Sequence, residues 1–167
     1  MNRDREPVKI IADIISHELD LPAERIFIYN DGRELPKDDN LYIVLSVMSR
    51  PPFGVKSSYR ESNNGLVEVQ TLNVKETIIA SAVSKNTDAR TRAYEVQMAV
   101  NSVFSEQLQE LYGCHISMIA PVRDMSFLEN TARLNRFDTE ITVLCAYEKV
   151  QDIDYFNTIR LNSRFEQ

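Results

Sequence analysis

The positions of apolar and polar residues along the chain predict a domain of mixed helices and strands. Residues 7–19 carry apolar side chains at helical spacing, and Pro7 suits the first helical position because its missing N–H needs no partner there. A longer helix is predicted from Asp88 to Tyr112, with Gly113 as its C-terminal cap. Each helix has one apolar face, so both are expected to pack against the same layer of strands.

Five segments are typical of β-strands, because Val, Ile, Thr and aromatic residues are concentrated in them. They are residues 25–29, 41–48, 66–83, 115–120 and 137–150. Residues 41–48 are apolar at nearly every position, which favours a strand that is covered on both faces in the centre of its sheet. Residues 124–130 are expected to hold a short helical turn that Asp124 or Ser126 would cap.

Strands outnumber helices in this order of elements, and most connections between them are short. The predicted fold class is therefore α+β, with a mainly antiparallel β-sheet flanked by two main helices. Residues 1–150 are predicted to form a single domain, with a hairpin arm at residues 50–65. Residues 151–167 form a polar C-terminal tail with spaced aromatic residues.

Residues 50–65 are the most unusual stretch of the sequence. Proline, glycine, serine, asparagine and charged residues interrupt the strand pattern there, and loops of this length inside compact domains are usually functional or mobile. Two interpretations stay open: a floppy end of a hairpin, or an arm that reaches a neighbouring subunit or partner. The candidate interface residues lie in this arm, in the C-terminal tail and at one further arginine: Arg50, Phe53, Lys56, Tyr59, Arg60, Arg136, Tyr155 and Phe156.

Composition and charge narrow the class of protein. The chain is 43% hydrophobic and 26% charged, which is ordinary for a folded domain, and at 167 residues it needs no metal or disulfide to fold. Its 25 acidic and 19 basic residues give a net charge of -6. This balance argues against a dedicated nucleic-acid-binding protein, although an acidic wall would let DNA slide past it.

The sequence lacks the patterns that carry catalysis or cofactor binding. Its four glycines are not spaced as a phosphate-binding loop, and its two histidines have no metal-ligand spacing. Cys114 and His115 are adjacent in a predicted strand, so their side chains point to opposite faces and cannot form a nucleophile–base pair. Cys114 and Cys145 are interpreted as two reduced thiols. We therefore expect no enzymatic activity, no cofactor and no metal.

The N-terminal residues Met1 to Glu6 lack the apolar stretch of a signal peptide. No run of residues approaches the length of about 18 apolar residues needed to span a membrane. The sequence is thus expected to function in an aqueous compartment, without a membrane partner.

Several segments together resemble the tail terminator and neck (head–tail joining) proteins of long-tailed bacteriophages. They are the strand Leu41-Tyr42-Ile43-Val44-Leu45-Ser46-Val47, the extended hairpin, the helix around Tyr94 to Leu111, and Asp124-Met125-Ser126-Phe127-Leu128 leading to Leu134-Asn135-Arg136-Phe137-Asp138. The resemblance spans roughly residues 5–150.

The resemblance implies a structural protein of the virion. Such proteins form a homohexameric ring that caps the tail tube protein and contacts the head–tail connector, and in contractile tails also the sheath protein. DNA passes through the lumen without specific binding, and assembly takes place in the host cytoplasm. The alternative function, from a different class, is a non-enzymatic binding adaptor or assembly chaperone.

Overall fold

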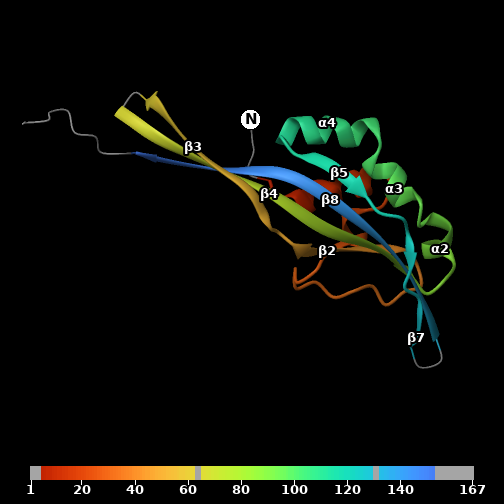
Figure 1. The fold of residues 1–167 in the computed structure, drawn as a ribbon. Coiled ribbons are helices and arrows are strands. Elements are labelled where there is room, and N and C mark those ends of the chain that lie inside the picture. Colours follow the sequence, from red (N-terminus) through yellow and green to blue (C-terminus); the bar gives the residue numbers. More distant parts are fainter. Residues whose placement is uncertain (1–4, 63–64, 130–131, 153–167) are drawn as a thin grey trace, which may run out of the picture.

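The computed structural model describes residues 5–62, 65–129 and 132–152 of the chain. Within them, one twisted sheet carries helices on one face, and a ribbon of three strands projects from the sheet (Figure 1). The sheet is mostly antiparallel, which confirms the α+β fold class predicted from sequence.

The main sheet has the strand order β1-β2-β4-β8-β5. Its strands are β1 (Ile26–Ile28), β2 (Tyr42–Ser49), β4 (Gly65–Ser84), β8 (Ala132–Asp152) and β5 (His115–Ile119). β1 and β2 run parallel, and the other neighbours run antiparallel. Three more strands pair along the sides of the long strands: β3 (Pro52–Ser62) with β4, and β6 (Arg123–Asp124) and β7 (Phe127–Glu129) with β8. All five predicted strands are present, with shifted bounds.

Helix α1 (Pro7–Glu18) begins at Pro7 as predicted and buries one wide apolar side. Its isoleucines share a core with Ile43 and Leu45 of β2 and with Ile78 and Ala80 of β4. We call the side of the sheet that carries Ile78 the helix face, and the opposite side the far face. A single turn of 3-10 helix (Ala23–Arg25) connects α1 to β1.

The single helix predicted from Asp88 to Tyr112 is wrong, because three short helices occupy this stretch. They are α2 (Asp88–Arg92), α3 (Glu95–Val100) and α4 (Val103–Tyr112). Ser102 is extended, and its hydroxyl accepts a hydrogen bond from the Ser105 N–H at 3.1 Å, which starts a new helix. The predicted cap is confirmed, since Gly113 is left-handed with φ of 66°.

One other prediction of local structure is wrong. Residues 124–130 hold no helical turn in their described part; they contribute to β6 and β7, which lie along β8. Residues 52–62, within the predicted hairpin arm, form the strand β3, which pairs with β4 residue by residue from Gly54 to Ser62 after a register shift at Phe53. Polar residues are common in β3 because both of its faces are exposed, so the alternation that identifies a strand is missing.

The connection between β1 and β2 covers part of the far face. Parallel strands need a long crossover, and residues 29–41 supply it. Phe27, Tyr42 and Val83 form a small buried cluster on this side. The guanidinium of Arg33 lies 4.7 Å from the centre of the Phe27 ring, so the crossover packs onto the cluster.

Candidate assembly surfaces

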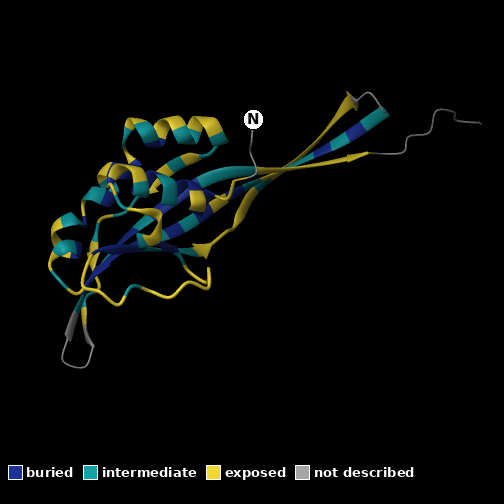
Figure 2. Cartoon of the chain, turned by 180° about the vertical axis from the view of Figure 1, so that it is seen from behind, coloured by how far each residue is buried: buried dark blue, intermediate teal, exposed yellow. Residues whose placement is uncertain are grey.

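The arm is a ribbon of three strands without helices on either face. It consists of β3, residues 65–74 of β4 and residues 145–152 of β8. Ten residues of strand span about 33 Å, so the arm extends well beyond the helical layer. Figure 2 shows its outer strands as exposed along nearly their whole length, whereas the sheet under the helices is buried.

Each outer strand of the arm pairs with β4 along its inner edge, and its outer edge has no pairing partner among the described residues. β3 pairs with β4 on one side only, and its other side faces solvent. β5 pairs with β8 only from Leu144 toward the start of that strand, so residues 145–152 have one unpaired edge. Unpaired strand edges present a row of N–H and C=O groups that can pair with another chain.

The register sorts the arm's side chains onto two faces, because directly paired residues point to the same side. On the helix face, Val55 pairs with Leu72 and Leu72 pairs with Tyr147. These three side chains are 74%, 37% and 40% exposed, so they form an apolar row just beyond the helices. We call it the apolar row.

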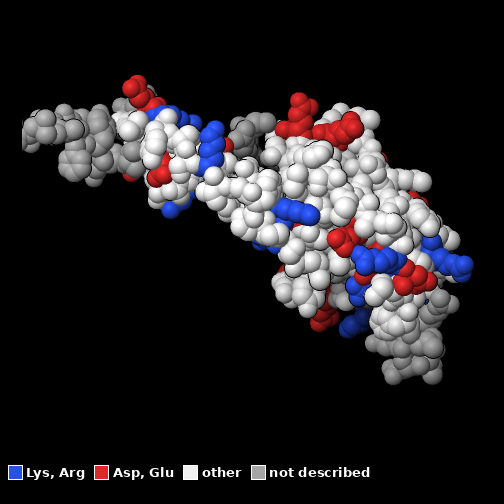
Figure 3. Space-filling model, viewed as in Figure 1, with Lys and Arg blue, Asp and Glu red and all other residues white. Residues whose placement is uncertain are grey.

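The far face of the arm carries charges at its two edges. Lys56 pairs with Thr71 and Thr71 with Glu148, so these three residues lie at one level. At a second level, Arg60 and Asp152 lie on either side of Val67. The β3 edge is therefore basic and the β8 edge acidic on this face. Figure 3 shows both signs of charge along the arm and no extended basic area on the side that it displays.

An ion pair between the buried Glu76 and the half-exposed Arg50 stands at the root of the arm, where β4 changes its partner from β2 to β3. The Glu76 side chain is fully buried, and the Arg50 Nε lies 2.9 Å from its Oε2. This is a close ionic contact without hydrogen-bond alignment at Oε2. Burial raises the pKa of Glu76, and the opposing charge of Arg50 only partly offsets this effect.

Two more titratable groups lie beside this ion pair on the helix face. The thiol of Cys145 donates to the Val74 carbonyl at 3.8 Å, and the phenol of Tyr147 lies near that thiol. Burial raises the pKa of Tyr147 to about 12 and also raises the pKa of Cys145. Both groups are therefore neutral at physiological pH, and neither is activated for chemistry.

The structure places the predicted interface residues at separate positions rather than in one site. Four of the predicted residues are exposed along β3: Phe53, Lys56, Tyr59 and Arg60. Lys56 and Arg60 both point to the far face, where they are the charged residues of β3. Arg50 is held by Glu76. Tyr155 and Phe156 lie outside the described residues.

Arg136 lies in the body, far along β8 from the arm. Its guanidinium makes two contacts of 2.9 Å with the carboxylate of Asp138 on the same strand. Asp138 is largely buried, so Arg136 already has a structural partner within the chain. An interface role for Arg136 stays a prediction.

Sequence reasoning missed Glu76, Val55, Leu72 and Tyr147. Val55, Leu72 and Tyr147 are far apart in sequence and become one row only through the register of three strands. Glu76 had a signal, because it is a lone acidic residue in the alternating apolar positions of residues 74–82. A charged residue in a core position usually has a partner, and that partner is Arg50.

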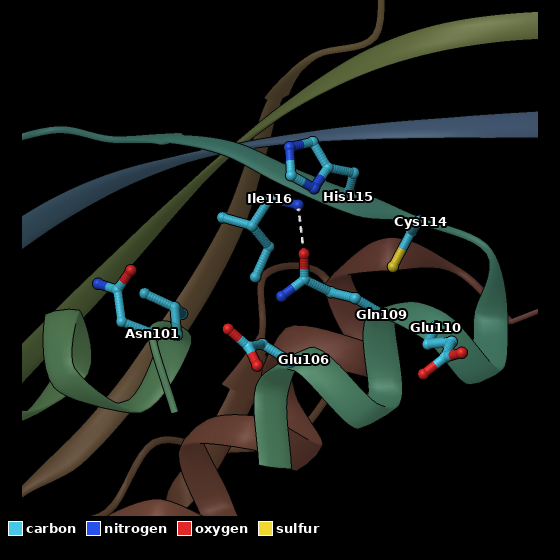
Figure 4. Close-up of a pocket in the computed structure, with 8 residues that line it drawn as sticks. Asn101, Glu106, Gln109, Glu110, Cys114, His115 and Ile116 are labelled. Atoms are coloured by element: carbon cyan, nitrogen blue, oxygen red, sulfur yellow. Dashed lines mark hydrogen bonds between the residues drawn. The ribbon is translucent and has the colours of Figure 1, made fainter. Parts of the chain in front are cut away.

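The groove between α4 and β5 has a structural explanation (Figure 4). It measures about 440 Å³, and Gln109 crosses its floor. The Gln109 Oε1 accepts from the Ile116 N–H at 2.8 Å, and its Nε2 donates to the Ser105 hydroxyl at 3.1 Å. Gln109 thus fastens α4 to β5, and its polar atoms are already engaged.

The same groove brings together a cysteine, a histidine and two glutamates without forming a catalytic arrangement. Cys114 and His115 point to opposite sides of the chain (Figure 4). Burial raises the pKa of Cys114 to about 11, so its nucleophilic thiolate is scarce at neutral pH. Cys114 and Cys145 are both free thiols.

In the described part of the chain, no group of three or more His, Cys, Asp or Glu side chains is arranged to hold a metal ion. No helix in that part has the length and apolar character needed to cross a membrane. The features that distinguish this molecule are thus its arm, the two unpaired edges and the ion pair at the arm's root.

Comparison with known proteins points in one direction. Residues 8–164 match the model of a family described as phage neck terminator protein. The match includes the body, the arm and most of the C-terminal tail. No curated protein matches the sequence.

Proposed function

The chain belongs to the phage neck terminator family, and we propose that it is the ring subunit that caps the tail tube and joins it to the head connector. The family implies a structural component of the virion neck. The finer assignment comprises a homohexameric ring, contacts with the tail tube protein and the connector, and passage of DNA through the lumen.

The arm is the observation that carries this proposal. A closed ring uses head-to-tail contacts, so each subunit needs two different and complementary surfaces. The two edges of the arm are complementary in charge on the far face, where β3 carries basic residues and β8 carries acidic residues. An isolated domain gains little stability from a ribbon about 33 Å long, at about 3.3 Å per residue, whose two outer strands are exposed.

The charge of the chain supports a lumen through which DNA slides. A net charge of -6 repels phosphates, and long-range repulsion keeps the duplex from adhering to the wall. Contact with a sheath protein belongs to the same proposal if the tail is contractile. Assembly is expected in the host cytoplasm before the tail joins the head.

The proposal is tested by light scattering on the purified chain, followed by negative-stain imaging alone and after mixing with purified tail tubes. A six-fold ring, free or seated on tube ends, is the expected result. A monomer that neither forms rings nor caps tubes contradicts the proposal. Such a monomer in a one-to-one complex with another neck protein would indicate the adaptor or chaperone function instead.

A matched pair of tyrosines locates the contact. Tyr59 on β3 and Tyr94 between α2 and α3 are 63% and 62% exposed. Tyr59→Lys is expected to prevent ring formation or tube capping, and Tyr94→Lys is expected to leave both intact. If the two variants form rings and cap tubes equally well, the arm is not part of the ring contact.

A further inference from the structure

We propose that neighbouring subunits join their arms edge to edge, with β3 of one copy pairing in parallel with residues 145–152 of β8 in the next copy. This inference rests on the proposed ring and specifies which strands form the contact. The result is a continuous band of sheet, with three strands from each subunit.

The geometry of one arm sets the orientation of the contact. β3 and β8 each run antiparallel to β4, so they run parallel to each other on opposite edges of the ribbon. A second copy placed beside the first in the same orientation therefore presents its β3 to the first copy's β8. This contact is head-to-tail and repeats from copy to copy, as a ring requires.

The charges on the far face match across this contact. Lys56 lies at the level of Glu148, and Arg60 lies at the level of Asp152, within one arm. At one strand spacing, about 4.8 Å, the second copy's Lys56 and Arg60 would lie beside Glu148 and Asp152 of the first copy. Two pairs of opposite charges form at the same levels, and no pair of like charges is created.

The helix face matches as well. The apolar row of Val55, Leu72 and Tyr147 ends at an exposed side chain on each edge. In the proposed contact, Tyr147 of one copy lies beside Val55 of the next, so the apolar row continues from subunit to subunit. Packing between these side chains removes apolar surface that a single copy leaves in water.

The same charges oppose the symmetric alternatives. Two β3 strands paired antiparallel around Ser58 would place Lys56 beside Arg60. Two β8 strands paired antiparallel around Val150 would place Glu148 beside Asp152. Like charges directly opposite each other destabilise a strand pair, so the edges favour the head-to-tail contact over a two-fold dimer.

Charge reversal tests the contact in the full-length chain. One variant combines Lys56→Glu with Arg60→Glu, and a second combines Glu148→Lys with Asp152→Lys. Each is expected to raise the protein concentration needed for ring formation by at least about tenfold, because two attractive pairs become repulsive at every contact. A one-to-one mixture of the two variants is expected to restore rings, since basic and acidic edges then alternate. A chain with all four substitutions restores them as well.

The matched control reverses two other exposed cations, Lys75→Glu on β4 and Arg90→Glu on α2. It lowers the net charge by the same amount as the variant with Lys56→Glu and Arg60→Glu, and it is expected to assemble like the natural sequence. Urea unfolding of each variant verifies that the fold is intact. Three outcomes would each overturn the inference. The charge-reversed variants form rings like the natural chain, their mixture fails to restore rings, or the control also fails to assemble.

A second measurement is independent of charge. Ser58 and Val150 lie at one level of the far face, two strands apart in one copy and one strand apart across the proposed contact. Mild oxidation of the variant with Ser58→Cys and Val150→Cys is expected to link copies covalently, whereas the parent chain and each single substitution are not linked. Rings that form without such links overturn the edge contact and leave the proposed function standing. If the natural chain forms no ring alone or on tubes, the proposed function fails first.

Discussion

The strands β4 and β8 each pass through two surroundings, a body and an arm, that differ in what lies above the helix face. In the body, helices cover Ile78 and Ile141, and both side chains are fully buried. In the arm, the same face of the same strands carries Leu72 and Tyr147, which are 37% and 40% exposed. The register between the strands continues unbroken from one region to the other. The comparison separates two roles of apolar residues on the helix face: Ile78 and Ile141 stabilise the body, whereas Leu72 and Tyr147 stay partly exposed and available for association.

The largest expected difference between the regions is in the cost of truncating a side chain. Ile78→Ala removes buried atoms in the body and should lower the free energy of unfolding by about 2 to 5 kcal/mol. Leu72→Ala, six residues away on the same face of β4, should cost less than about 1 kcal/mol. Urea unfolding followed by circular dichroism measures both. Equal losses would mean that the arm is as well packed as the body.

The second effect concerns the boundary between the regions. Arg50→Met leaves the Glu76 carboxylate buried without its counter-charge, which should cost about 1 to 3 kcal/mol at neutral pH, because solvent already screens the half-exposed Arg50. Lys75→Met is the control, because Lys75 is adjacent to Glu76 but is exposed on the opposite side of the strand. The two free energies of unfolding are compared in urea. An equal loss of unfolding free energy in both variants would mean that the ion pair does not stabilise the root of the arm.

The pH dependence of the unfolding free energy tests the burial of Glu76 at the same boundary. The pKa of Glu76 is raised in the folded chain above its ordinary value of 4.5. A raised pKa means that the contribution of Glu76 to stability is present below pH 4.5 and is lost as the pH rises through the folded-state value. The stability of the natural chain relative to Glu76→Gln should therefore fall as the pH rises above 4.5. A difference that is independent of pH would contradict the burial of this carboxylate. Arg50→Met should enlarge the total fall and extend it to higher pH, because Arg50 lowers the pKa of Glu76.

The smallest effect lies in the helices that cover the body. Ser102→Ala removes the hydroxyl that accepts from the Ser105 N–H, and should cost about 1 kcal/mol. Ser57→Ala on the exposed strand β3 is the matched control and should change stability by less than about 0.5 kcal/mol. Thermal unfolding of the two variants provides the measurement. Equal melting temperatures would show that the cap of α4 contributes nothing to the body.

Much of the body was predictable because its residues obey simple periodicities. The strand at residues 41–48 and the helix at residues 7–19 follow from burial of one side or both sides. The break of the second helix was harder to identify, since the apolar spacing continues across Asn101 and Ser102. Their capping chemistry was the available signal, and the side-chain hydrogen bond of Ser102 outweighs the spacing.

The arm was located by its composition, but its conformation was not predictable from it. A strand exposed on both faces has no alternation of apolar and polar residues, so the sequence predicted a hairpin arm at residues 50–65 without identifying the strand β3. The matched edges depend on which residue of β3 lies level with which residue of β8 across β4. That relation is a property of the register, and no pattern within a single segment specifies it.

The unbroken pairing of β4 with β8 has a mechanical consequence. The ladder runs from Val67 opposite Asp152 at the tip of the arm to Ser84 opposite Asn135 in the body, with no irregularity between them. At that far end the Asn135 amide donates to the Asn86 carbonyl at 2.6 Å, directly before α2. The ladder therefore has no break in register at which the arm could turn independently of the body. We expect a rotation imposed on the arm to be carried in part toward the start of α2, some 60 Å away at about 3.3 Å per residue of strand.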